Sequence, residues 1–135
     1  MKIQIELIPQ SQHRYEGTVG DWWIDADGVL QIRASEMENR LHSTLVALHE
    51  VVEALVVGIQ KTRQLSVPQW LVESVDVFDK QYIEDETDEP GYSADAPYYE
   101  AHMIASTIEH LVAMLLKVDY NVYESAVDSI AQPST

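Results

Sequence analysis

The chain contains no cysteine among its 135 residues. This absence excludes a disulfide framework and any metal site with thiolate ligands, and it is consistent with a reducing compartment. Basic residues are also scarce, since 8 Lys and Arg stand against 23 Asp and Glu and give a net charge of −15. Because binding to nucleic-acid phosphates requires a surface of Lys and Arg, we expect no binding to DNA or RNA. The acidity is explained by a solvated surface, by cation capture, or by mimicry of a nucleic-acid backbone.

Long hydrophobic runs are missing as well. No apolar run approaches the ~20 residues that a transmembrane helix needs. The first seven residues alternate polar and apolar side chains, which differs from the continuous apolar stretch of a signal peptide. We therefore expect no membrane partner and a cytoplasmic location. With 46% hydrophobic residues the chain can build a packed core, and its length predicts a single domain over residues 1–135.

Residues 1–34 are predicted to be β-rich. Alternation over residues 1–8 indicates one strand, and two apolar segments around residues 22–25 and 29–33 flank a short turn that ends at Gly28. This pattern predicts a hairpin that the first strand completes into a small antiparallel sheet. Trp22 and Trp23 are expected to cap the sheet against the helices.

Residues 35–131 are predicted to be helical. The expected helices span residues 36–61, 67–84, 97–117 and part of 118–131, with an acidic surface loop over residues 85–97. The first helix is apolar on nearly all sides, which is typical of a central, buried helix. The predicted fold is therefore α+β, a small antiparallel sheet packed on three to four helices.

The central helix carries an unusual set of polar residues in the segment His49-Glu50-x-x-Glu53. At 100° per residue, Glu53 lies about 40° and Glu50 about 100° around the helix from His49. Ionised side chains on a buried helix cost several kcal/mol each unless they are paired or bind a metal ion. This arc therefore predicts a compensating partner.

Two further helices each carry a stripe of polar side chains. Asp76 and Asp79 stand at i and i+3 on the second helix, and His102 and Glu109 lie within about 20° of each other on the third. The other side of the third helix is expected to face the core, and it consists of Ile104, Ile108, Leu111 and Leu115.

Imidazole together with carboxylate suits Zn, Mn, Fe or Ni, whereas oxygen ligands alone suit Mg. We therefore predict a divalent metal ion (Zn, or Mn or Mg) with ligands drawn from His49, Glu53, Asp76, Asp79, His102 and Glu109. The alternative is that these groups pair through hydrogen bonds, or that some of these polar stripes face solvent.

Two hydrolytic functions fit this set. The strands followed by a His-Glu-x-x-Glu helix resemble the zincin metallohydrolases, which implies His49 and Glu53 as ligands, Glu50 as general base, and a third ligand from Asp76, Asp79 or His102. The zincin motif ends in His where this chain has Glu53, although a carboxylate also binds zinc.

The second reading involves four carboxylates. Glu50-x-x-Glu53 followed by Asp76-x-x-Asp79 resembles the carboxylate quartet of all-helical nucleoside triphosphate pyrophosphohydrolases, which implies Mg. An Asp replaces the Glu expected at the third place, and the leading hairpin is foreign to that family. A non-enzymatic alternative is an acidic accessory protein that binds a host factor.

The chain also resembles a set of uncharacterised proteins of tailed bacteriophages and prophages. The matching segments are Gly20–Trp23, Leu30–Arg33, Val46–Glu50 with Glu53-Ala54, Asp76–Asp79, Glu89–Gly91, Ala96–Tyr98, His102 with Ala105, and Ile108-Glu109. The resemblance implies a phage or prophage protein in a bacterial cytoplasm and supplies no reaction. Ala101 stands where this group has Glu. Expected partners are a small-molecule or peptide substrate and a second copy of the chain.

Overall fold

The structure, a computed structural model, describes residues 1–85 and 90–131. Three strands, β1 (Ile3–Ile8), β2 (Gly20–Ile24) and β3 (Leu30–Ser35), form a sheet in the order β1-β3-β2. The predicted hairpin is confirmed as the antiparallel pair β2–β3. Its turn is stabilised by Asp25, whose Oδ1 accepts hydrogen bonds from the backbone N–H groups of Asp27 and Val29, and Gly28 supplies the positive φ of 78°.

The sheet is mixed, which corrects the expectation of a purely antiparallel one. β1 pairs in parallel with β3, with Ile5 opposite Ile32. The connection over residues 9–19 places β2 two strand positions away from β1, a distance of about 9–10 Å. β3 then occupies the position between β1 and β2. β1 and β2 run in opposite directions, so β3, which is antiparallel to β2, is parallel to β1.

Four helices follow the sheet, as predicted, and together they confirm the α+β fold. They are α1 (Arg40–Thr62), α2 (Gln69–Asp85), α3 (Tyr99–Leu115) and α4 (Tyr120–Ala131). α1 begins later than predicted because Asn39 caps it, its side-chain oxygen accepting from the Leu41 N–H. The expected loop over 85–97 contains the short 3-10 helix η2 (Pro90–Tyr92), and residues 86–89 of that loop lie outside the described residues.

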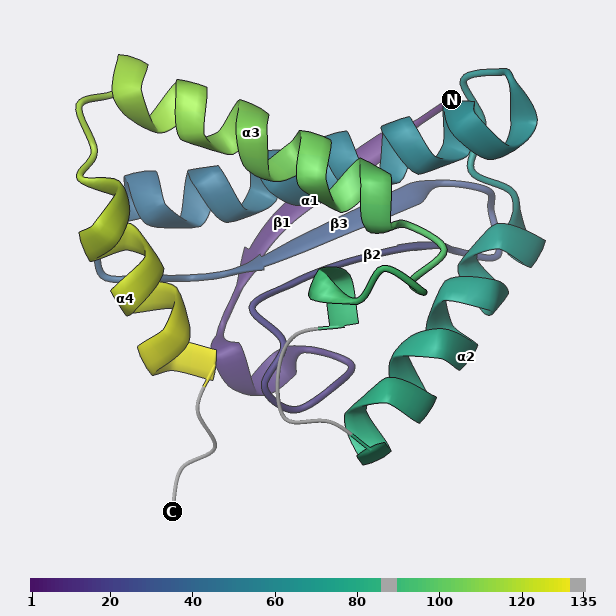
Figure 1. The fold of residues 1–135 in the computed structure, drawn as a ribbon, viewed down its shortest axis with the longest axis horizontal. Helices are drawn as coiled ribbons and strands as arrows, with labels where there is room; N and C mark the ends of the chain where they lie inside the picture. Colours follow the sequence, from purple (N-terminus) through teal and green to yellow (C-terminus); the bar gives the residue numbers. More distant parts are fainter. Residues whose placement is uncertain (86–89, 132–135) are drawn as a thin grey trace.

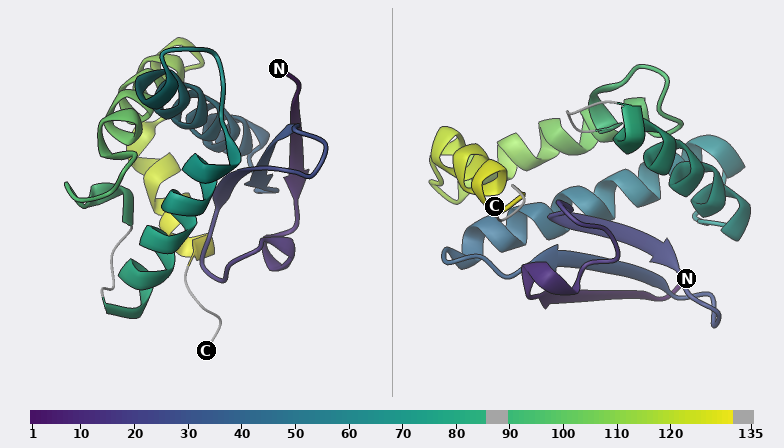
Figure 2. Two further views of the ribbon diagram at one scale, coloured as in Figure 1. Left: turned by 90° about the vertical axis from the view of Figure 1, so that its right-hand side faces the viewer. Right: turned by 90° about the horizontal axis from the view of Figure 1, so that it is seen from below.

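The elements form three layers with α1 in the middle. The sheet covers one side of α1 and α3 lies along the other, while α2 and α4 flank the two ends (Figure 1, Figure 2). Leu45, Ala54 and Val57 of α1 have no exposed surface. One apolar cluster joins the sheet to α1, α2 and α3 around Ile32, and a second joins α1 to α4 around Tyr123. The prediction of a central helix is confirmed.

α1 is also long and apolar enough, by length and composition alone, to cross a membrane. Half of its most apolar 18-residue stretch is buried within the fold. Core helices of globular proteins share these properties, so the composition of α1 is a weak indication of a membrane span.

α3 is rotated relative to the sequence-based expectation. Ile104, Leu111 and Leu115 were predicted to face the core, but they are 45%, 56% and 81% exposed, so this prediction is wrong. The side of α3 that faces α1 instead carries His102 and Glu109 between small residues, namely Ala101, Ala105 and Ala113. The small side chains let the two helices approach closely, and that approach brings the polar side chains into contact across the interface.

Candidate metal centre

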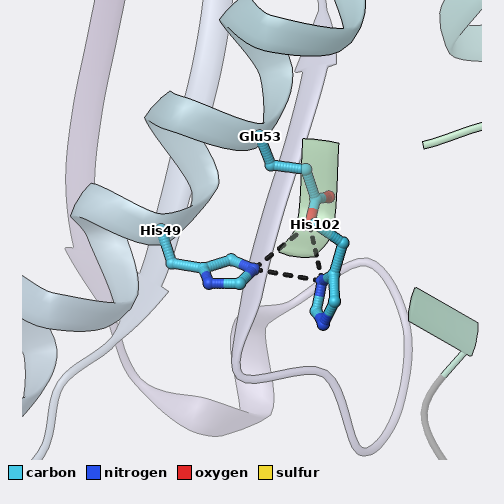
Figure 3. A group of neighbouring side chains, drawn as sticks. All are labelled: His49, Glu53 and His102. Carbon is cyan, nitrogen blue, oxygen red and sulfur yellow. Dashed lines mark hydrogen bonds and ion pairs between the residues drawn. The ribbon is translucent and has the colours of Figure 1, made fainter. Parts of the chain in front are cut away.

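Three candidate ligand atoms converge in the contact between α1 and α3. His49 and Glu53 lie one turn apart on α1, and His102 reaches them from α3 (Figure 3). Nε2 of His49 is 3.1 Å from Oε2 of Glu53 and 3.2 Å from Nδ1 of His102, and Nδ1 of His102 is 2.9 Å from the same Glu53 oxygen. The three residues are at most 8% exposed. In residues 1–85 and 90–131, no other group of three His, Asp or Glu residues is placed to share an ion.

These separations fit the coordination sphere of a divalent ion. Bonds of about 2.0–2.1 Å place neighbouring ligand atoms about 3.3 Å apart in a tetrahedral site and about 3.0 Å apart on one face of an octahedral site. The observed separations of 2.9–3.2 Å already match the octahedral value and need only a small expansion to reach the tetrahedral one. Two imidazoles and one carboxylate form the donor set of His₂Glu zinc hydrolases and also suit Mn and Fe.

The residues behind the ligands orient them. Nδ1 of His49 donates to Oε2 of Glu109 at 2.7 Å, which directs Nε2 towards the centre. The hydroxyls of Tyr120 and Tyr123 lie near Glu109, close enough for its charge to act on both. Burial and the nearby Glu109 charge raise the pKa of both tyrosines, so they stay protonated and can donate.

Glu53 is held from the sheet. The indole Nε1–H of Trp22 donates to Oε1 of Glu53 at 2.9 Å, and this bond leaves Oε2 facing the two imidazoles. Trp22 therefore caps the sheet against the helices, as predicted, and also positions the candidate ligand Glu53.

His102 is fixed by the chain that precedes α3. A Cβ added at Gly91 would lie 2.6 Å from Nδ1 of His102, so only glycine fits against this ring. The ring of Tyr92 meets the imidazole edge-on, with 5.6 Å between ring centroids. The short helix η2 thus forms one wall of the centre.

The carboxylate charges around this centre are balanced by His49. Burial lowers the pKa of His49, but the hydrogen bonds to Glu109 and Glu53 outweigh burial and raise this pKa to about 11. Burial likewise opposes ionisation of Glu53, but hydrogen bonds from His102 and His49 hold its pKa below the usual value. A protonated His49 therefore lies between two carboxylates, and a bound ion would replace its Nε2 proton.

Asp76 and Asp79 lie outside this centre. Oδ1 of Asp76 is 3.5 Å from the guanidinium of Arg14, which also forms a two-point hydrogen bond with Asp21. Asp79 accepts a 2.6 Å hydrogen bond from the hydroxyl of Tyr98. The two Asp side chains of α2 therefore do not join His49, Glu53 and His102 at a common ion position.

Glu50 lies beside the centre on the β2 side of α1. A Cβ added at Gly20 would be 2.5 Å from Oε1 of Glu50, so the half-buried carboxylate of Glu50 rests against the backbone of β2.

The remaining histidines have other contacts. His42 lies 3.4 Å from the Asn39 amide nitrogen near the start of α1, and the exposed His110 stacks on Tyr120.

The sequence predicted His49, Glu53, His102 and Glu109 as ligands, and the structure brings their side chains together, but Glu109 lies behind His49 and not among the three converging atoms. Nothing in the sequence indicated four residues that contact this group, namely Trp22, Gly91, Tyr120 and Tyr123. Tyr120 and Tyr123 stand at i and i+3, which places them on one face of α4, but nothing in that spacing reveals that the face meets Glu109.

Comparisons with protein-family models, with curated proteins and with solved structures find no match to this chain. The resemblances to phage proteins and to metallohydrolases therefore remain predictions.

Proposed function

We propose that this protein is a divalent-metal-dependent hydrolase whose ion is held by His49, Glu53 and His102. One observation carries the proposal: two imidazole nitrogens and a carboxylate oxygen lie within 3.2 Å of one another in a buried helix contact. The hydrogen bond from His49 to Glu109 adds the outer carboxylate that commonly orients a metal-binding histidine.

Zn²⁺ is the ion that this donor set suits best, with Mn²⁺ and Fe²⁺ as the nearest alternatives. When bound, such an ion supplies Lewis-acid polarisation of a substrate and activation of water. The protein holds the three ligands in place. Trp22 hydrogen-bonds to Oε1 of Glu53 and Glu109 to Nδ1 of His49, which are the atoms of these ligands that do not face the ion. His102 can offer Nδ1 by carrying its proton on Nε2.

Glu50 is the proposed general base. It follows His49 directly and lies between the two α1 ligands in sequence, as the catalytic Glu does in the zincin arrangement. Its half-buried carboxylate is on the same helix as two ligands, where it can accept a proton from an attacking water. In this chain the second motif position is Glu53 and the later helix supplies His102, so the order of ligands differs while the donor set is the same.

The contacts of α2 favour this function over magnesium-dependent pyrophosphohydrolysis. That alternative needs Asp76 and Asp79 to join Glu50 and Glu53 around magnesium and phosphates. Asp76 instead pairs with Arg14, and Asp79 with Tyr98.

Metal content tests the ligand assignment. Protein prepared without a histidine tag is expected to bind one equivalent of Zn²⁺, measured by elemental analysis, and to melt at a higher temperature with the ion. His49→Ala and His102→Ala are expected to lose the ion, whereas the matched control Asp76→Asn keeps it. Full occupancy in both histidine variants would contradict the assignment.

Turnover tests the hydrolase. The zinc-loaded protein is expected to cleave members of a panel of peptide, amide and ester substrates, and Glu50→Gln should retain the ion while losing at least about 100-fold in kcat. Release of pyrophosphate from nucleotides with Mg²⁺ would support the quartet instead. A protein that binds zinc and cleaves nothing on the panel would point to the non-enzymatic accessory role.

A further inference from the structure

The outward side of α3 is apolar and uncovered. Ile104, Leu111 and Leu115 lie within about 40° of one another around the helix, and they are 45%, 56% and 81% exposed. Large aliphatic side chains grouped in this way usually mark an interaction surface, whereas single exposed ones do not.

α1 continues this surface. Its residues at about 240–280° from His49 are apolar, with Leu41 and Ile59 exposed and Leu48 and Leu55 half-buried. None of the residues on this arc of α1 carries an ionisable side chain.

The edge strand β1 provides a third part. Ile3, Ile5 and Leu7 pair with the fully buried Leu30, Ile32 and Ala34 of β3, so they point to the side of the sheet that α1 covers. They are nevertheless 38–53% exposed, because α1 packs over β3 and β2 and leaves β1 open.

These three parts lie on one side of the molecule. Glu50, at 100° around α1, rests on Gly20 of β2, so β1, at the other edge of the sheet, lies towards the arc of Leu48 and Leu55. α4 packs near the segment that leads into β2, since Val19 and Tyr123 share one apolar cluster and a Cβ added at Gly17 would be 3.3 Å from the carbonyl oxygen of Ala131. This position leaves the β1 side open. We call this combined surface of β1, α1 and α3 the apolar face.

We propose that the apolar face binds a second copy of this chain across a two-fold axis. In such a dimer each copy buries the same surface, so an apolar face meets an apolar face, and Glu100, one turn before Ile104 on α3, lies at its edge. The most apolar elements of the fold then become internal, as in homodimers whose interfaces resemble a core cut in half.

The size of the face is sufficient. Its ten large aliphatic residues, about half exposed, present on the order of 500 Å² if a fully exposed side chain offers about 100 Å². A standard interface buries about 800 Å² on each partner, of which about two thirds is apolar in homodimers. The face therefore matches the apolar part of a stable interface.

The charge of the protein argues for a protein partner over a lipid surface. Peripheral helices that lie on membranes carry Lys and Arg beside their apolar side. This chain has only 8 basic residues and a net charge of −15, which opposes approach to anionic lipid.

Sedimentation of the full chain tests the proposal. The wild-type protein at about 50 μM is expected to sediment at twice the 15.3 kDa of one chain. Leu111→Glu with Leu115→Glu places two charges on the apolar face and should raise the dimer dissociation constant at least about 100-fold. Both positions are exposed, so circular dichroism is expected to show an unchanged helical fold.

Val77→Glu is the matched control, since Val77 is 66% exposed on α2, away from the apolar face; this variant should remain dimeric. A wild-type chain that is monomeric at this concentration, or a dimer unaffected by the double substitution, would overturn the proposal. Flotation of a monomeric wild type with vesicles of phosphatidylcholine and phosphatidylglycerol would instead assign the face to lipid. None of these readouts depends on metal or turnover.

Discussion

Nδ1 of His49 lies 2.7 Å from Oε2 of Glu109, and this buried hydrogen bond joins the two helices of the candidate metal centre. Glu109 is thereby placed behind His49 and not among the three converging ligand atoms. We predict that Glu109→Gln weakens zinc binding about 10–100-fold, the usual effect of losing an outer carboxylate, and leaves the stoichiometry at one. Competition with a chromogenic chelator measures both quantities.

Glu100→Gln is the control for that measurement, because Glu100 lies on the exposed side of α3 with Gln60 as its partner. Its zinc affinity should equal that of the wild type. Complete loss of zinc in Glu109→Gln would make Glu109 a direct ligand.

The metal-free protein should become less stable as the pH rises above neutrality. His49 has a pKa of about 11 in the fold and 6.5 as its ordinary value, so its contribution is complete below pH 6.5 and is lost as the pH rises towards 11. The lowered pKa of Glu53 gives a contribution that is present above about pH 4.5 and lost in acid. The pair therefore stabilises the fold most between about pH 4.5 and 6.5.

Urea unfolding in EDTA at pH 6 and pH 9 measures this effect. The free energy of unfolding should fall by at most ~1.4 kcal/mol per pH unit on account of His49. His49→Gln should remove this fall, and an equal fall in both proteins would assign the pH dependence to other groups.

Zinc affinity should depend on pH in the opposite direction. Because zinc replaces the Nε2 proton of His49, we predict that one proton is released and that affinity rises about tenfold per unit between pH 6 and 8. Calorimetry in buffers of different ionisation enthalpy counts the protons. Binding with no proton release would mean that His49 is not the ligand that gives up a proton.

The helices and the grouping of the candidate ligands could be predicted because their signals are local. The 3.6-residue period places His49 with Glu53 and His102 with Glu109, and the cost of burying such groups indicates that they need one another. The period does not state which side of a helix faces inwards when one side is apolar and the other is polar with small residues. α3 has that pattern, and the apolar side of Leu111 was therefore assigned to the core although it is exposed.

The two acidic residues of α2 show a second limit. Their spacing equals that of a ligand pair, but Arg14 and Tyr98 reach them from segments 62 and 19 residues away. Such long-range partners depend on the packing of the connection before β2 and of the start of α3, for which sequence spacing gives no signal.

Replacing Asp79 with Asn should stabilise the metal-free protein at pH 8. Burial and nearby carboxylates, chiefly Glu53, outweigh the hydrogen bond from Tyr98 and raise the pKa of Asp79 to about 7. A raised carboxyl pKa means that ionisation costs stability as the pH rises from about 4 to 7. Asn keeps an acceptor for the Tyr98 hydroxyl and carries no charge, so Asp79→Asn should gain on the order of 1–2 kcal/mol at pH 8 and little at pH 4.

Urea unfolding in EDTA at these two pH values measures the difference, with the exposed Asp128→Asn as control. A gain of equal size at both pH values would show that charge is not the cause.

Gly91→Ala should impair zinc binding without removing any ligand. The added Cβ would lie 2.6 Å from Nδ1 of His102, the atom proposed to bind the ion, so either η2 or the imidazole must move by several tenths of an ångström. Displacement of one ligand atom by that amount is expected to reduce zinc affinity at least about tenfold, because ligand distances are held within about 0.2 Å in metal sites. Ser93→Ala, in the same segment but without such a contact to His102, should bind zinc like the wild type. If Gly91→Ala also binds zinc with unchanged affinity, His102 does not supply Nδ1 from the position that the structure gives it.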